Sequence, residues 1–125
     1  MIYNRQNAVG SLKPNGSWSW HGFDYANLKW DEINTDTKPT ESEIDAEVTR
    51  LNNAEPMRLL RVERDRRLSA CDWVSAKATD TGVAVTTAWK TYRQALRDLP
   101  ASASPSLDSY GYLDMTSVTW PTEPS

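Results

Sequence analysis

Few side chains in this sequence have the type and spacing that chemistry requires. The one histidine, His21, and the one cysteine, Cys71, lie far apart in the chain. A Cys–His pair needs a third group to orient the base and a pocket for the substrate, and the local sequence indicates neither. Zinc needs four closely spaced Cys, His or carboxylate ligands, and the phosphate-binding motifs GxGxxG and GxxxxGK[ST] are missing. The sequence therefore predicts that the protein is not an enzyme and uses no metal or other cofactor.

Two charged stretches could instead bind charged partners. Residues 41–47 are mainly acidic, but acidic side chains at a helix start are explained by solvent and by the positive end of the helix dipole. Residues 58–67 contain five arginines, and guanidinium groups match phosphates well. However, Glu63 and Asp65 interrupt this cluster, and the net charge is −3. We therefore expect a solvated, internally paired helix face, with neither nucleic acid nor a membrane as a partner.

Aromatic side chains mark the first part of the chain. After a polar, turn-rich start, Trp18 and Trp20 alternate with serines, so both rings point to the same side of a strand. Leu28 and Trp30 repeat this alternation. The pattern predicts a Trp-rich β-hairpin module over residues 1–38.

The aromatic face of this hairpin has two interpretations. Two strands alone are marginal in water, so the face must pack on something. The following helix offers only the narrow stripe of Ile44, Val48 and Leu51. The rings therefore form either an internal core or an anchor for a partner, a common use of exposed tryptophan. We predict partner binding by Trp18, Trp20, Phe23 and Trp30.

Local signals also define the predicted helices. Thr40 and Glu43 fit a capping box, which begins a linking helix within residues 39–55 that ends near Asn52–Asn53. Pro56 suits the first turn of a new helix that contains the arginines. Asp72-Trp73 begins a connector, and residues 77–82 are predicted to form a loop.

The last helix has the strongest period in the chain. Between Val83 and Leu99, apolar side chains recur at helical spacing, and Pro100 is predicted to end the helix. The Ser/Pro-rich segment that follows is predicted to be flexible, before Trp120-Pro121 docks on the helices. The predicted core of this helical hairpin consists of Leu60, Leu68, Trp73, Trp89, Tyr92, Leu96 and Trp120.

The whole chain is short and only modestly apolar. It has 125 residues, of which 38% are hydrophobic, and it shows no apolar run of the roughly 20 residues that span a bilayer. A lone cysteine and the lack of a secretory signal favour a soluble protein of a reducing cytoplasm. The predicted fold class is α+β: a hairpin module (1–38), a linking helix (39–55), and a helical domain with a flexible tail (56–125).

The second half of the chain resembles the phage tail assembly chaperone family. The resemblance lies in three segments, RVERDRRLSACDW, AWKTYRQALRDLP and VTWP, which follow that family's motifs. A longer Ser-rich loop with Tyr110 and Tyr112 departs from the family pattern. The motif positions present here are Arg61, Arg64, Asp65, Leu68, Asp72, Trp73, Trp89, Tyr92, Arg93, Leu96, Arg97, Leu99, Pro100, Trp120 and Pro121.

This resemblance implies a role in building a phage tail. The implied function is non-enzymatic binding of a tail-fibre or baseplate protein during virion morphogenesis in the host cytoplasm. The alternative is a structural subunit of the fibre or baseplate that stays in the virion. A homo-oligomer is also compatible with the sequence. Besides the aromatic face, the predicted partner-binding residues are Arg64, Arg67, Arg93 and Arg97.

Overall fold

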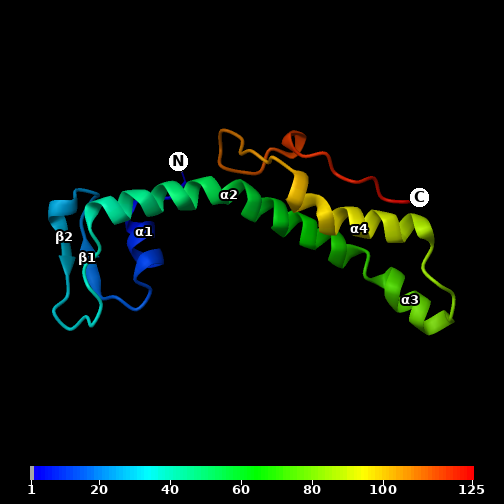
Figure 1. Cartoon of the computed structure of the whole chain (residues 1–125), viewed down its shortest axis with the longest axis horizontal. Helices are drawn as coiled ribbons and strands as arrows, with labels where there is room; N and C mark the ends of the chain where they lie inside the picture. Colours follow the sequence, from blue (N-terminus) through cyan, green and yellow to red (C-terminus); the bar gives the residue numbers. More distant parts are fainter. Residues whose placement is uncertain (1) are drawn as a thin grey trace. The chain divides into compact units, whose positions relative to one another are not determined.

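The computed structural model describes residues 2–125, which divide between Glu55 and Pro56 into two compact units. Each unit has its own hydrophobic core. The chain contains several helices and one small antiparallel sheet, so the coarse α+β prediction is confirmed (Figure 1). One helix, α2 (Glu41–Ala70), gives its first part to the N-terminal unit and its last part to the C-terminal unit.

Helix α2 is continuous through Pro56, so the predicted helix end at Asn52–Asn53 is wrong. A proline inside a helix removes one backbone hydrogen bond, here the bond to the carbonyl of Asn52. Glu55 and Leu60, on either side of the proline, are both buried. The predicted capping box at the start of α2 is confirmed, because Thr40 and Glu43 each accept a hydrogen bond from the other's amide at 3.1 and 3.0 Å.

The N-terminal unit begins with a helix, α1 (Arg5–Leu12), where the sequence predicted turns. Its first turn is capped reciprocally: Asn4 accepts from the amide of Asn7 at 3.0 Å, and Asn7 accepts from that of Asn4 at 2.9 Å. The guanidinium of Arg5 binds the Asp45 carboxylate at 2.8 Å. Helix α1 is therefore fastened along the first part of α2.

A second tie between these helices is a buried carboxylate. Glu47 accepts a hydrogen bond from the Ser11 hydroxyl at 2.6 Å and pairs with Arg50 at 2.5 Å. The hydrogen bonds from Arg50, and then from Ser11, lower the pKa of Glu47 to about 2. The charged form of Glu47 thus contributes to the stability of this unit.

The predicted strands form a two-stranded antiparallel sheet. Strand β1 (Trp18–Trp20) pairs with β2 (Leu28–Trp30), and the short 3-10 helix η1 (Tyr25–Asn27) precedes β2. In the register, Trp18 lies opposite Trp30 and Trp20 opposite Leu28. The core beneath the sheet combines both strands with α1 and α2; its buried members are Ala8, Val9, Trp20, Leu28 and Ile44.

The C-terminal unit has three α-helical segments where the sequence predicted two. The last part of α2 is followed by α3 (Trp73–Thr81), so the predicted loop over residues 77–82 is wrong. Gly82 ends α3 in a left-handed conformation, with φ 72°, and its amide donates to the carbonyl of Ala78 at 3.0 Å. Because the side chains of α3 are mostly small and polar, its sequence resembles a loop.

Helix α4 (Thr87–Ser102) is the helix with the strong apolar period. It continues past Pro100 to Ser102, so the predicted stop at Pro100 is wrong by two residues. In the C-terminal unit, buried side chains of the helices and of the last segment form two clusters. One contains Cys71, Val74, Tyr92 and Leu96, and the other contains Leu60, Leu99 and Val118.

The segment after α4 is held by side-chain hydrogen bonds. The Asp108 carboxylate accepts from the amides of Tyr110 and Tyr112 at 2.8 and 3.0 Å, and a β-bridge joins Leu107 and Leu113. A short 3-10 helix, η2 (Met115–Ser117), leads to Val118 and Trp120, which pack on the clusters. The departure from the family pattern therefore still allows Trp120 to dock.

Candidate functional site

The predicted aromatic face lies largely in the core of the N-terminal unit. Trp20 is only 8% exposed, and its Nε1 donates to the carbonyl of Asp24 at 2.8 Å. Trp18 and Trp30 are half-buried against the same core, whereas Phe23 is exposed. The sequence offered only the narrow stripe of the following helix as cover for the rings, but Ala8, Val9 and Leu12 of α1 also belong to or pack against this core. The partner-binding role of these residues stays a prediction.

Arg93 is the most engaged of the four predicted partner-binding arginines. From α4 its guanidinium donates to the carbonyl of Leu68 at 3.1 Å and to Sγ of Cys71 at 3.0 Å. A further bond reaches the Asp72 carboxylate at 3.1 Å. Arg93 therefore fastens α4 to the end of α2 and uses three of its five N–H donors within the unit.

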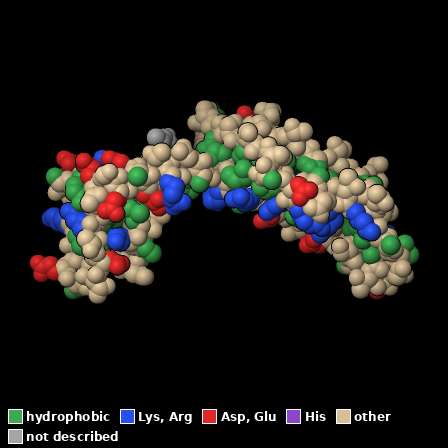
Figure 2. All heavy atoms as spheres, in the orientation of Figure 1, with side chains coloured by type: hydrophobic (Ala, Val, Ile, Leu, Met, Phe, Trp, Pro, Cys, Tyr) green, Lys and Arg blue, Asp and Glu red, His purple; other side chains and the backbone are tan. Residues whose placement is uncertain are grey.

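The other three arginines also have partners inside the C-terminal unit. The guanidinium carbon of Arg67 lies 4.2 Å from the ring centroid of Trp120, a cation–π contact, and Nε binds Glu63. Arg64 reaches the carbonyl of Arg97 at 3.3 Å. The exposed side chain of Arg97 donates a hydrogen bond to Gln94 at 3.4 Å. In Figure 2, basic side chains on this unit are interspersed with acidic ones, as the sequence predicted.

Glu63 is the acidic centre of this charged helix face. Hydrogen bonds from Arg66, with a smaller contribution from Arg67, lower the pKa of Glu63 to about 2, against the opposing effect of burial. Arg66 pairs with Glu63 at 2.6 Å and Arg67 at 3.0 Å. These pairs neutralise the arginines locally, which weakens the case for a phosphate-binding surface.

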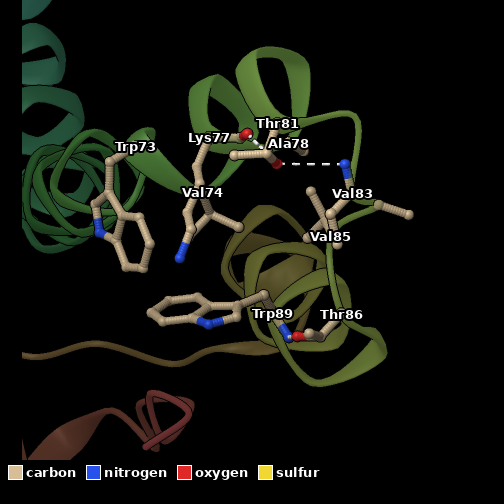
Figure 3. A pocket seen from close by; sticks show the side chains of 10 residues that line it. Trp73, Val74, Lys77, Ala78, Thr81, Val83, Val85, Thr86 and Trp89 are labelled. Atoms are coloured by element: carbon tan, nitrogen blue, oxygen red, sulfur yellow. Dashed lines mark hydrogen bonds between the residues drawn. The ribbon is translucent and has the colours of Figure 1, made fainter.

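An open groove between α3 and α4 was not predicted from the sequence. Trp73 and Trp89 form one wall in an edge-to-face arrangement, with ring centroids 5.4 Å apart and an interplanar angle of 77° (Figure 3). The rest of the lining comes from one face of α3 and from the connector to α4; it consists of Val74, Lys77, Ala78, Thr81, Val83, Ala84, Val85 and Thr86. The groove has a cavity volume of about 170 Å³.

Two helix ends build this groove. Gly82 turns the chain out of α3, and the Thr86 hydroxyl accepts a hydrogen bond from the amide of Trp89 at 3.4 Å to begin α4. The prediction that Trp73 belongs to the core is wrong, because its side chain is 52% exposed. As the first residue of α3, Trp73 packs against Trp89 and turns much of its remaining surface to solvent. The other aromatic and aliphatic residues of the predicted core lie in or against the two clusters.

A signal for this groove was present in the sequence. Trp73, Val74, Lys77, Ala78 and Thr81 follow the spacing of one helix face and end just before a glycine. The signal was hidden because polar residues around Lys77 favour a loop. Lys77 is the only charged residue of the lining, and it makes no ion pair within residues 2–125.

The comparisons with known proteins concern this same unit. The sequence model of the family described as phage tail assembly chaperone protein matches residues 57–125, more than half of the chain. The chain belongs to this family. The match spans almost the whole C-terminal unit, Pro56–Ser125, and confirms the resemblance carried by the arginine, tryptophan and proline motifs. No curated protein and no solved structure matches the chain significantly.

The reactive side chains of this member of the phage tail assembly chaperone family are few in the part of the chain that the structure describes. Within the described residues, no group of three or more His, Cys, Asp or Glu side chains could hold a metal ion. Cys71 is 1% exposed and hydrogen-bonded. None of the described helices is long and apolar enough to cross a bilayer.

Proposed function

We propose that this member of the phage tail assembly chaperone family is a non-enzymatic binding protein of virion morphogenesis. It binds a tail-fibre or baseplate protein in the host cytoplasm while the tail is assembled. The observation that carries the proposal is the coincidence of the family match with one compact unit, Pro56–Ser125. That unit is the part of the chain whose sequence carries the family's role.

The use of side chains in this unit supports binding over catalysis. Arg64, Arg67 and Arg93 hold its segments together. Large apolar side chains also remain at the surface of this unit: among them, Val62, Trp73 and Val83 are 55%, 52% and 68% exposed. Exposed tryptophan is enriched among the residues that dominate the energy of protein interfaces. A partner that covers Trp73 would gain more than one that contacts an arginine already paired.

Co-expression with individual tail genes tests this proposal. Each fibre or baseplate protein of the same phage is produced with the chain or with an empty vector, and its soluble fraction and co-purification are measured. We expect one of them to become more soluble and to co-purify with the chain. If no fibre or baseplate protein changes in either measurement, the proposal is wrong.

Mass spectrometry of purified virions then separates the proposed role from the structural alternative. A chaperone that leaves the tail is absent from finished particles, whereas a fibre or baseplate subunit is present at a fixed copy number. We expect the chain to be absent from purified virions.

Sedimentation of the purified chain measures whether it forms the homo-oligomer that is compatible with the sequence.

A further inference from the structure

We propose that the groove between α3 and α4 binds a short segment of the tail protein in which a bulky apolar side chain lies next to a carboxylate. The apolar side chain fills the groove between Trp73 and Val85, and the carboxylate pairs with Lys77. This inference rests on the proposed function and names the chemistry of the partner at one site. The residues of the groove differ from those of both partner-binding surfaces predicted from the sequence, the aromatic face of the hairpin and the set of four arginines.

The size of the groove limits what it can hold. Its volume of about 170 Å³ is close to the ~150 Å³ of an apolar cavity that accommodates a benzene ring. One phenylalanine, leucine or methionine side chain therefore fits, and a packed helix does not. The groove opens to solvent, so the backbone of the bound segment stays outside and only the side chain enters.

The walls of the groove favour an apolar occupant. Val74, Ala78 and Val85 supply aliphatic surface, and Trp73 and Trp89 supply aromatic surface. Figure 3 shows the two indoles approaching each other edge to face beside Val74, so that the face of one ring and the edge of the other both border the groove. Figure 2 also shows hydrophobic side chains exposed at the end of this unit that α3 occupies.

The charge of the groove lining indicates which group lies next to the apolar side chain in the bound segment. Lys77 is the one charged residue of the lining, and in Figure 3 its side chain runs from α3 toward the two indoles. No described acidic side chain pairs with it. An ammonium at the border of an apolar site favours a carboxylate on the ligand. A nucleic acid is disfavoured, because its affinity comes from several cations along the backbone and the groove has one.

The test uses the full chain, labelled with nitrogen-15, and the indole N–H signals of its tryptophans in NMR spectra. The probe is the peptide acetyl-Gly-Ser-Phe-Glu-Ser-Gly-amide, with two matched peptides that carry Gln in place of Glu or Ala in place of Phe. We expect the first peptide to shift the signals of Trp73 and Trp89. Affinity should fall about threefold for the Gln peptide, as for an exposed ion pair, and at least tenfold for the Ala peptide.

Variants of the chain assign the charge effect to Lys77. In Lys77→Gln, the Glu and Gln peptides should bind equally. Lys90→Gln is the matched control, because Lys90 lies on α4 outside the lining and also makes no ion pair among the described residues; it should retain the threefold difference. Trp73→Ala should lose binding while the indole signals of Trp18, Trp20 and Trp30 keep their positions, since the Trp73 side chain is half exposed. The Trp89 signal should move in this variant because it loses its ring contact with Trp73.

Three results would overturn the inference. The first is equal binding of the Glu and Gln peptides to the unmodified chain. The second is a set of shifts confined to tryptophans outside the groove. The third is movement of the Trp73 and Trp89 signals with protein concentration alone, which would show that a second copy covers the groove.

The co-expression experiment keeps this inference separate from the proposed function. If the peptides fail to bind but the chain still solubilises a tail protein, the groove inference is wrong and the proposed function stands. If the peptides bind as expected but no tail protein responds to the chain, the ligand chemistry inferred for the groove is supported, whereas the proposed function and the assignment of the ligand to a tail protein are wrong.

Discussion

Replacing Trp20 with alanine should unfold much of the N-terminal unit. The indole is 8% exposed, and a buried tryptophan removes roughly 150–250 Å² of surface from water. At about 25 cal/mol per Å², this burial is worth roughly 4–6 kcal/mol. Measured tryptophan-to-alanine losses of about 3–5 kcal/mol agree with that figure. The lost hydrogen bond to Asp24 adds little, because the exposed Asp24 can bind water instead. We expect a loss of about 4 kcal/mol.

The assay must separate the two units. In a urea titration followed by NMR, the indole signals of Trp18 and Trp30 report on the N-terminal unit, and that of Trp89 reports on the C-terminal unit. Trp20→Ala should lower the urea midpoint for the first two signals and leave the third unchanged. Trp18→Ala is the matched control, because its ring is only half-buried, and it should cost about half as much.

This experiment also decides between the two interpretations of the aromatic face. A partner-binding face predicts that Trp20 can be replaced with little loss of stability. A free-energy loss below about 1 kcal/mol would refute the argument from burial. Such a small loss would instead favour partner binding by the aromatic residues of the hairpin.

Two further changes test the same unit. Gly16→Ala should lower the free energy of unfolding in urea by about 1–3 kcal/mol, because the added Cβ would lie 2.6 Å from the ring of Trp30. The control Gly10→Ala should be neutral or stabilising, because a Cβ at Gly10 meets nothing within 4 Å. Equal effects of the two substitutions would contradict this prediction. Acid should lower the stability of the N-terminal unit through Glu47, whose pKa is lowered from 4.5 to about 2. The contribution of the charged Glu47 to the free energy of unfolding is complete above pH 4.5 and is lost as the pH falls toward 2. Since Arg50 is 62% exposed, solvent screens its pair with Glu47, and we expect a loss of only about 1–2 kcal/mol in the free energy of unfolding between pH 6 and pH 3. Glu47→Gln should abolish this part of the pH dependence.

The sequence predicted the elements whose side chains carry a strong period. In α4, Trp89, Tyr92, Leu96 and Leu99 recur on one face, and burial of that face follows from the spacing. The alternation of Trp18 and Trp20 likewise predicted the strand that pairs with β2. In both elements the local pattern and the tertiary packing favour the same structure.

The two missed helices lack such a pattern. In α1 the fully buried side chains are the small adjacent pair Ala8 and Val9, and the cap uses two asparagines in place of the usual Ser/Thr and Glu. In α3 only Val74 is buried. Their helical state depends on packing against residues distant in sequence, which a single sequence does not display.

The candidate site could be predicted only in part for the same reason. The sequence identified Trp73 and Trp89 as important apolar residues, but it could not tell which one α3 would leave exposed. Without α1, the tryptophans of the hairpin had no visible cover, so the sequence favoured them as an interface. Because α1 was not predicted, the core around the hairpin tryptophans was missed, and because α3 was not predicted, the groove was missed.

The single cysteine gives the C-terminal unit a built-in chemical reporter. Cys71 is 1% exposed, and a thiol reagent reaches such a side chain only when the surrounding structure opens. The alkylation rate of the unmodified chain therefore measures how often this cluster opens, without a fluorescent label or an engineered residue. The same measurement works in a crude lysate, where a tail protein that steadies the unit would slow the labelling of Cys71.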